Sequence, residues 1–282
     1  MDSSLLFGIT MIAYLLSSAF YLGLFVFRFE RVGQIGMVLA SVGIGVQTVA
    51  IGLRWYESYQ MGIGRAPLTN MYESLVFFAW CIACFYLWLE FRFKSRIMGA
   101  FVMPCAALAM AYASFSDRID DQITPLIPAL QSNWLIAHVV TCFIGYAAFT
   151  VAGGLGLMYL LRASSENSQR PGLMADTLPA LKIIDDITHK SIVFGFIWLS
   201  AGIITGAIWA NEAWGTYWSW DPKETWSIIT WFMYALTLHA RFTRGWRGKR
   251  IAWLAIIGFL AVFFTYFGVN FLLSGLHSYG SS

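Results

Sequence analysis

Eight apolar stretches, each long enough to cross a membrane, dominate this sequence. A transmembrane helix needs roughly 20 mostly apolar residues. Of the 282 residues, 59% are hydrophobic and only 12% are charged, which is more apolar material than a soluble core of this size can bury. The sequence therefore predicts an all-α, polytopic membrane protein with spans near residues 5–27, 33–53, 71–90, 97–115, 134–161, 191–210, 222–242 and 251–273.

Lysine and arginine are distributed unevenly over the connections between these stretches. Fourteen of the eighteen lie in one alternating set of connections, and Arg54, Arg65, Arg118 and Lys223 lie on the other side. Because positive charge in short loops stays on the cytoplasmic side, we expect both termini to be extracytoplasmic. No basic segment precedes the first span and no cleavage site follows it, which favours a retained helix over a signal peptide. We expect residues 1–282 to form a single membrane domain.

The four cysteines all fall inside predicted spans. Cys81 and Cys84 form a CxxC pair, but Phe85 follows where a c-type haem attachment motif needs histidine. The chain is therefore not itself predicted to be a c-type cytochrome. Cys105 and Cys142, like this pair, are expected to be small packing residues.

The densest aromatic cluster lies between the sixth and seventh spans, at about residues 211–226 on the outer side. Thirteen positions hold Trp214, Tyr217, Trp218, Trp220 and Trp226. Two interpretations are open. Tryptophan is common at membrane interfaces, so the cluster could be an aromatic belt. Alternatively it forms an interfacial re-entrant loop or a site for a flat apolar ligand, because indole rings bury large planar faces at low cost in side-chain entropy.

Acidic residues near two of the predicted helix starts have the spacing of helix caps. Asp221, Pro222 and Glu224 fit the N-cap, first and third positions of a capping box, which predicts that the seventh span begins at Pro222. Asn70 and Glu73 have cap-like spacing at the outer start of the third span. Both pairs favour a structural over a catalytic role.

Two histidines lie on the same side as the aromatic cluster. His138 follows a proline-containing amphipathic segment and lies about one turn into the fifth span, and His277 lies just past the eighth. A single histidine near an interface is usually only a hydrogen-bonding residue. Two of them beside an aromatic surface also suit the axial ligation of haem iron.

The other two histidines lie toward the cytoplasmic side. His239 is about 25 Å along its helix from Pro222, still within apolar sequence. An ionisable residue within a span is a candidate for function, and an interfacial histidine beside Arg241 is the alternative. His189 falls in a basic connection and is expected to be solvated.

Motifs of other chemistries are missing from the sequence, including a phosphate-binding glycine loop, HExxH and a nucleophile elbow. Gly153, Gly154 and Gly156 in the fifth span predict close helix packing.

The segment from Gly202 to Arg241, GIITGAIWANEAWGTYWSWDPKETWSIITWFMYALTLHAR, resembles the tryptophan-rich WWD segment of haem-handling proteins. The match is to the CcsA/ResC type of the System II cytochrome c maturation pathway. Residues 65–80, 128–139 and 269–279 resemble that type in the same order and distinguish it from its CcmC and CcmF relatives. The resemblance covers most of the chain beyond residue 60.

The resemblance implies a protein that brings haem b to the outer face as a substrate. With a ResB/CcsB-type partner it would present haem to the CxxCH motif of an apocytochrome c. It would thus be a subunit of a haem lyase (holocytochrome c synthase) that is inactive alone. The alternatives are a CcmC-like carrier that loads a haem chaperone without lyase activity, and a transporter or structural subunit anchored by the aromatic loop. The expected location is a bacterial inner membrane or a thylakoid membrane.

Carried over position by position, the haem-contacting residues are His138, His277, His239, Trp214, Trp218, Trp220, Asp221 and Trp226. The resemblance implies that the first two are axial ligands of the haem iron and that the third binds haem in transit. The remaining five correspond to the WWD segment, against which the macrocycle would lie.

Overall fold

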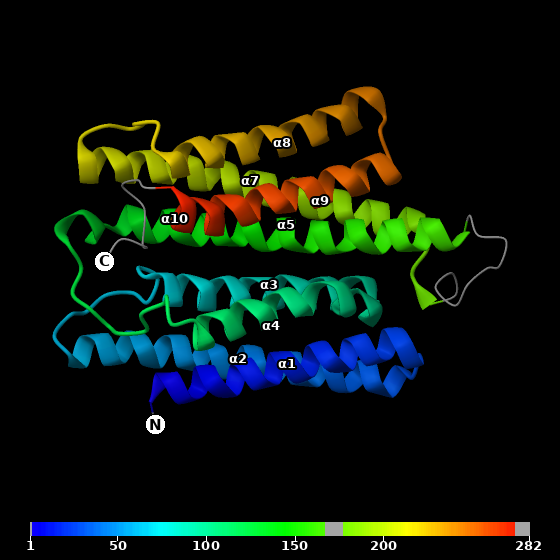
Figure 1. Cartoon of the computed structure of the whole chain (residues 1–282), viewed down its shortest axis with the longest axis horizontal. Helices are drawn as coiled ribbons and strands as arrows, with labels where there is room; N and C mark the ends of the chain where they lie inside the picture. Colours follow the sequence, from blue (N-terminus) through cyan, green and yellow to red (C-terminus); the bar gives the residue numbers. More distant parts are fainter. Residues whose placement is uncertain (1, 167–176, 274–282) are drawn as a thin grey trace.

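The computed structural model describes residues 2–166 and 177–273, and long helices account for most of them (Figure 1). Within these described residues, seven helical segments meet the length and hydropathy of a membrane span, and α8 has a similar length but is less apolar. The helices are α1 (Ser3–Phe27), α2 (Glu30–Gln60), α3 (Met71–Phe93), α4 (Gly99–Phe115), α5 (Asn133–Glu166), α7 (Leu181–Trp214), α8 (Pro222–Arg244), α9 (Lys249–Phe263) and α10 (Val269–Leu272), with short 3-10 turns η1 (Arg96–Met98) and η2 (Pro128–Leu130) and the π-helical turn η3 (Phe264–Gly268). The chain is therefore a polytopic helical membrane protein, as predicted.

The two ends of the bundle differ in charge, as the sequence predicts. The start of α1, the end of α10 and the α2–α3, α4–α5 and α7–α8 connections all lie at one end (Figure 1). Of the fourteen basic residues in the other connections, the thirteen that the structure describes lie toward the opposite end. We call these the outer and inner ends, following the charge bias.

Several helices extend beyond the apolar stretches from which they were predicted. The sixth span was predicted at 191–210, whereas α7 covers Leu181–Trp214. Its additional inner turns contain Asp185, whose carboxylate pairs with Arg241 at 2.9 Å and accepts a hydrogen bond from the Gly248 N–H at 2.8 Å. These tertiary contacts stabilise a helical segment that hydropathy alone cannot detect.

The long helix α5 occupies the centre of the bundle and contacts α3, α4, α7 and α9. A Cβ on Gly154 would lie 2.7 Å from the carbonyl oxygen of Phe101 on α4, and one on Gly156 would lie 2.7 Å from that of Ala252 on α9. Gly153 faces α9 at a similar distance. The predicted close packing through these three glycines is confirmed.

At the outer end, a buried group of charges fastens the connection that leads into α5. Asn70 caps α3, with its Oδ1 accepting from the Glu73 N–H at 2.8 Å, as predicted. The Glu73 carboxylate pairs with Arg54 Nε at 2.9 Å and Arg65 Nη1 at 2.6 Å, and all three side chains are buried. Both guanidinium groups also donate to backbone carbonyls within 116–132, at 2.6 and 2.9 Å. The α4–α5 connection is thereby held against the α2–α3 connection.

Candidate functional site

The His138 side chain lies at the outer end of the interface between α5 and α7. Its Nδ1 is 2.7 Å from the carbonyl oxygen of Gly202 on α7. Because a carbonyl oxygen only accepts hydrogen bonds, a neutral imidazole here carries its proton on Nδ1 and its lone pair on Nε2. Metal-binding histidines are commonly oriented by such a bond from the second ring nitrogen. Nε2, which carries the lone pair, is therefore the ring atom that could bind a metal.

Two glycines on α7 make room for the imidazole and for the cysteine one turn further along α5. A Cβ on Gly206 would lie 2.5 Å from His138 Nδ1, and one on Gly202 would lie 2.5 Å from Cys142 Sγ. These distances are far below ordinary van der Waals contact, so neither position accepts a side chain without movement. The four-residue spacing of the two glycines is typical of closely packed membrane helices. Together they form a slot that fixes the His138 ring.

Trp209 continues the glycine face of α7, because it lies three residues after Gly206 and seven after Gly202. Its ring stacks on the His138 imidazole, with centroids 6.0 Å apart and 17° between the planes, and it meets Trp214 edge-on at 6.4 Å. It is only 3% exposed. The sequence interpretation missed Trp209, although its spacing from the two glycines was a usable signal.

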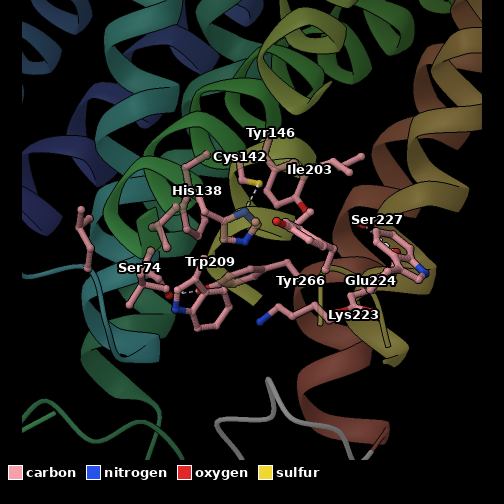
Figure 2. Close-up of a pocket in the computed structure, with 18 residues that line it drawn as sticks. Ser74, His138, Cys142, Tyr146, Ile203, Trp209, Lys223, Glu224, Ser227 and Tyr266 are labelled. Carbon is pink, nitrogen blue, oxygen red and sulfur yellow. Dashed lines mark hydrogen bonds between the residues drawn. The ribbon is translucent and has the colours of Figure 1, made fainter. Parts of the chain in front are cut away.

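A cavity opens beside His138, between the outer ends of α5, α7 and α8 and the π-helical turn (Figure 2). Its volume is about 100 Å³, which is below the roughly 300–1,000 Å³ of typical ligand pockets, so a macrocycle would be enclosed in it only in part. Much of its wall is aromatic, with a lysine, a glutamate and several hydroxyl groups. Lining residues include His138, Tyr146, Trp209, Trp218, Lys223 and Tyr266.

The four tryptophans of the predicted cluster do not form one stacked surface. Trp218 lines the cavity, and Trp220 meets it edge-on at 5.7 Å but is 72% exposed. Trp226 packs on Phe264 at 4.2 Å. Trp214 is the last residue of α7 rather than part of a loop. Trp218 and Trp209 are therefore the indoles beside the cavity.

The seven-residue connection 215–221 is fixed by the predicted capping box. Asp221 Oδ1 accepts from the Lys223 N–H at 2.9 Å, and Glu224 Oε2 accepts from the N–H groups of Asp221 at 3.2 Å and Ser219 at 2.8 Å. The start of α8 at Pro222 is confirmed. Asp221 is buried at this cap, where its side chain helps to hold the connection in place.

The π-helical turn η3 contributes Tyr266 to the wall of the cavity. Such turns interrupt the regular bonding of a helix and are frequent at functional sites. Within it, the Tyr266 hydroxyl lies 2.5 Å from Ser74 Oγ, and the Tyr266 carbonyl accepts from Asn270 Nδ2 at 2.6 Å. Asn270 Oδ1 in turn accepts from Lys223 Nζ at 3.1 Å. The turn thus links α3 and α8 across the cavity.

The remaining predicted histidines lie elsewhere. His239 is exposed near the inner end of α8, about 25 Å along the helix from Pro222, so the structure does not bring it to the cavity. His189 was predicted to be solvated, but its ring is partly buried against Phe242, with centroids 5.3 Å apart. His277 lies outside the described residues.

Comparison with known proteins places the chain in a family. The family model described as "Cytochrome C assembly protein" matches residues 68–277. The cytochrome c biogenesis protein CcsA of Guillardia theta is 39% identical, covering 97% of this chain and 95% of that protein. For CcsA of Chlamydomonas reinhardtii the identity is 42%, over 86% of this chain and 69% of that protein. For CcsA of Parasynechococcus marenigrum (strain WH8102) it is 40%, over 89% and 87%.

A solved structure shares the fold. The structure named "Cytochrome c Heme Lyase CcmF" superposes with a TM-score of 0.67 at 17% sequence identity, covering 94% of this chain. The chain spans 47% of that longer protein, so this likeness supports the helical arrangement alone. The family model and the CcsA relatives together show that this chain belongs to the cytochrome c assembly protein family, as a CcsA-type cytochrome c biogenesis protein.

Proposed function

We propose that this protein binds haem b, as a substrate, in the outer cavity, with His138 as an axial ligand. The observation that carries this proposal is the orientation of the imidazole. Nδ1 is held by the Gly202 carbonyl, which directs the lone pair to Nε2, and the ring stacks on Trp209 at the edge of an aromatic cavity. A macrocycle already supplies four ligands to its iron, so the protein needs to add only axial ligands such as imidazole.

The remaining predicted site residues take different parts in this proposal. His277 would supply the second axial ligand, as the resemblance implies. Trp218 would contact the macrocycle together with Trp209, and Trp214 would act by supporting the Trp209 ring. Asp221 would fix the connection that carries Trp218. Trp220, which is exposed, and Trp226, which lies on α8, would be the outlying members of the WWD segment.

We further propose that bound haem is presented for covalent attachment. The two thiols of a CxxCH motif in an apocytochrome c would add across the two haem vinyl groups. A ResB/CcsB-type partner would complete this haem lyase. The CcsA names of the relatives support a role in cytochrome c biogenesis, and their sources in plastids and cyanobacteria fit a thylakoid or bacterial inner membrane.

His239 would bind haem on its way from the inner side. The position of His239 supports this role, because its ionisable side chain lies on the exposed face of a helix that starts at the cavity. A haem molecule held there would face the bilayer or a partner protein rather than the interior of this bundle.

Spectroscopy of the purified protein loaded with haem tests the ligand assignment. With two imidazole ligands the haem should be low-spin and six-coordinate. His138→Gly should lose this spectrum and regain it when free imidazole is added, because the slot and Trp209 remain in place. His277→Gly should behave in the same way, and His189→Gly should behave like wild type. An unchanged spectrum for His138→Gly without imidazole would refute the assignment.

Reconstitution in a host that lacks its own maturation system tests the attachment step. Co-expression with an apocytochrome c and a ResB-type protein should yield covalent haem, and omission of the ResB-type protein should abolish it. If instead this chain transfers haem to a chaperone and attachment never depends on the ResB-type protein, the CcmC-like carrier is the correct function.

A further inference from the structure

One lysine lines the outer cavity. Lys223 is the second residue of α8, and its side chain extends from the helix into the cavity, with the ammonium end toward Trp209 (Figure 2). Nζ donates to Asn270 Oδ1 at 3.1 Å, which fixes the ammonium group on the π-helical side. Among the described residues around this cavity, it is the one lysine or arginine. The buried carboxylate of Asp221 is close enough to attract the ammonium group, and an anion that enters with a ligand would add a second stabilising charge in this largely apolar wall.

The carboxylate of the neighbouring glutamate is hydrogen-bonded to the loop. Glu224 also contributes to the wall, but its Oε2 accepts hydrogen bonds from the backbone N–H groups of Ser219 at 2.8 Å and Asp221 at 3.2 Å. These bonds draw the carboxylate toward the connection 215–221. The Glu224 carboxylate is thus engaged by the capping box, whereas Lys223 Nζ donates to Asn270.

A neutral donor belongs to another residue that lines the cavity. The indole nitrogen Nε1 of Trp218 is buried and has no hydrogen-bond partner within the part of the chain that the structure describes. A buried N–H without an acceptor is unfavourable, so it indicates a place for an acceptor brought by a ligand. Trp218 and Lys223 line the same cavity, and a carboxylate binds well to a cation combined with an N–H donor.

We propose that Lys223 and the indole N–H of Trp218 form a carboxylate-binding subsite that receives the propionate groups of haem. This inference rests on the proposed function, since it assigns the orientation of the haem in the same cavity. The vinyl groups of haem b lie on the opposite edge of the macrocycle from the propionates. Anchoring the carboxylates at the start of α8 therefore turns the vinyl edge, where thioether bonds would form, away from this helix.

Two probes that differ only in their carboxylates test the subsite. The full-length protein in detergent or nanodiscs is titrated with haem b and with haem b dimethyl ester, in which both carboxylates are blocked. Wild type should bind haem b about tenfold more tightly than the ester, which corresponds to one charge-assisted hydrogen bond. Lys223→Gln should abolish this preference by weakening haem b binding alone, and Lys223→Arg should retain most of it.

Two further variants separate the contributions. Trp218→Phe keeps an aromatic ring but removes the N–H, and should reduce the preference for haem b by a smaller factor. Lys182→Gln removes an exposed lysine at the inner end of α7 and should leave both affinities unchanged.

The outcomes distinguish the subsite from the proposed function. If wild type gives no histidine-ligated spectrum with either probe, the haem site itself is wrong. If wild type binds haem b and its ester equally well, haem binds without a carboxylate subsite and the inference is refuted. The same conclusion follows if Lys223→Gln weakens both probes equally, because the lysine then only supports the fold. The comparison on wild type needs no variant, so it holds even if Lys223→Gln does not fold.

Discussion

The glycine slot predicts that one added methyl group on α7 disrupts haem ligation. In Gly206→Ala the new Cβ would lie 2.5 Å from His138 Nδ1 and 2.7 Å from Cε1. Ordinary contact begins near 3.4 Å, so the ring or the helix must move by 3.4 − 2.5 = 0.9 Å. The ring is held between the Gly202 carbonyl and Trp209 and cannot swing aside without losing one of these contacts. We expect a loss of about 1–3 kcal/mol in stability from overpacking.

The functional effect should exceed the effect on stability. Losing the hydrogen bond that orients a ligating histidine typically lowers metal affinity by about 10–100-fold. Haem titration of purified Gly206→Ala should show a weakening in this range, with loss of the low-spin spectrum. The matched control is Gly45→Ala on α2, where the added Cβ meets nothing within 4 Å. This control should bind haem like wild type and should unfold at a temperature no lower than wild type.

A double variant identifies the cause of any defect. If the methyl group acts by displacing the imidazole, then His138→Ala should largely remove the destabilisation caused by Gly206→Ala, because the clashing ring is gone. Added imidazole should rescue His138→Gly better than the double variant His138→Gly/Gly206→Ala, in which the methyl group occupies part of the vacated space. Wild-type haem affinity and spectrum in Gly206→Ala would refute the slot.

Three further predictions concern other parts of the molecule. His239→Ala should lower the haem content of the outer site without lowering protein levels, measured by pyridine haemochrome assay, and an unchanged content would favour a merely interfacial histidine. Glu73→Gln leaves two buried arginines without their shared carboxylate and should cost about 3–5 kcal/mol in thermal unfolding, whereas Glu166→Gln in a partly exposed pair should change little. Reporter fusions after Glu212 should be extracytoplasmic and those after Arg247 cytoplasmic, and a cytoplasmic Glu212 would overturn the whole functional argument.

The membrane architecture could be predicted because its signals are local. Hydropathy over about 20 residues identified the spans, and the positive charges identified which connections share an end of the bundle. The start of α8 was predictable for the same reason, since Asp221, Pro222 and Glu224 act within one helical turn. The inner turns of α7 were not predicted, because they depend on the contact of Asp185 with Arg241 on another helix.

The candidate site could be predicted only in part because it is assembled from distant segments. His138 was singled out by its depth and side, and Trp218 by the density of rings around it. Their relation to one another was not visible, because the bond to the Gly202 carbonyl joins residues 64 positions apart. The stacking of Trp209 likewise requires knowing which face of α7 meets α5.

Lys223 shows how a local signal can conceal a role in the site. In the sequence it lies between Asp221 and Glu224, and the capping box explains why those two residues occur there. Its own side chain became interpretable only when the π-helical turn placed Asn270 beside it. A π-helical turn has no sequence signature comparable to a helix cap, so this part of the wall could not have been anticipated.

These observations locate the control of the site in the backbone of α7 rather than in the tryptophan rings alone. The helix supplies the carbonyl that orients His138, the two glycines that admit its ring, and Trp209 that covers it. It ends at Trp214, and the following connection, fixed by the capping box, returns at once to Lys223. A continuous segment from Gly202 to Lys223 therefore determines the orientation of the His138 ring and contributes Lys223 to the wall of the cavity. It follows that small residues on the α5-facing side of α7 should tolerate substitution less well than exposed rings such as Trp220, although the rings are the more conspicuous feature of the sequence.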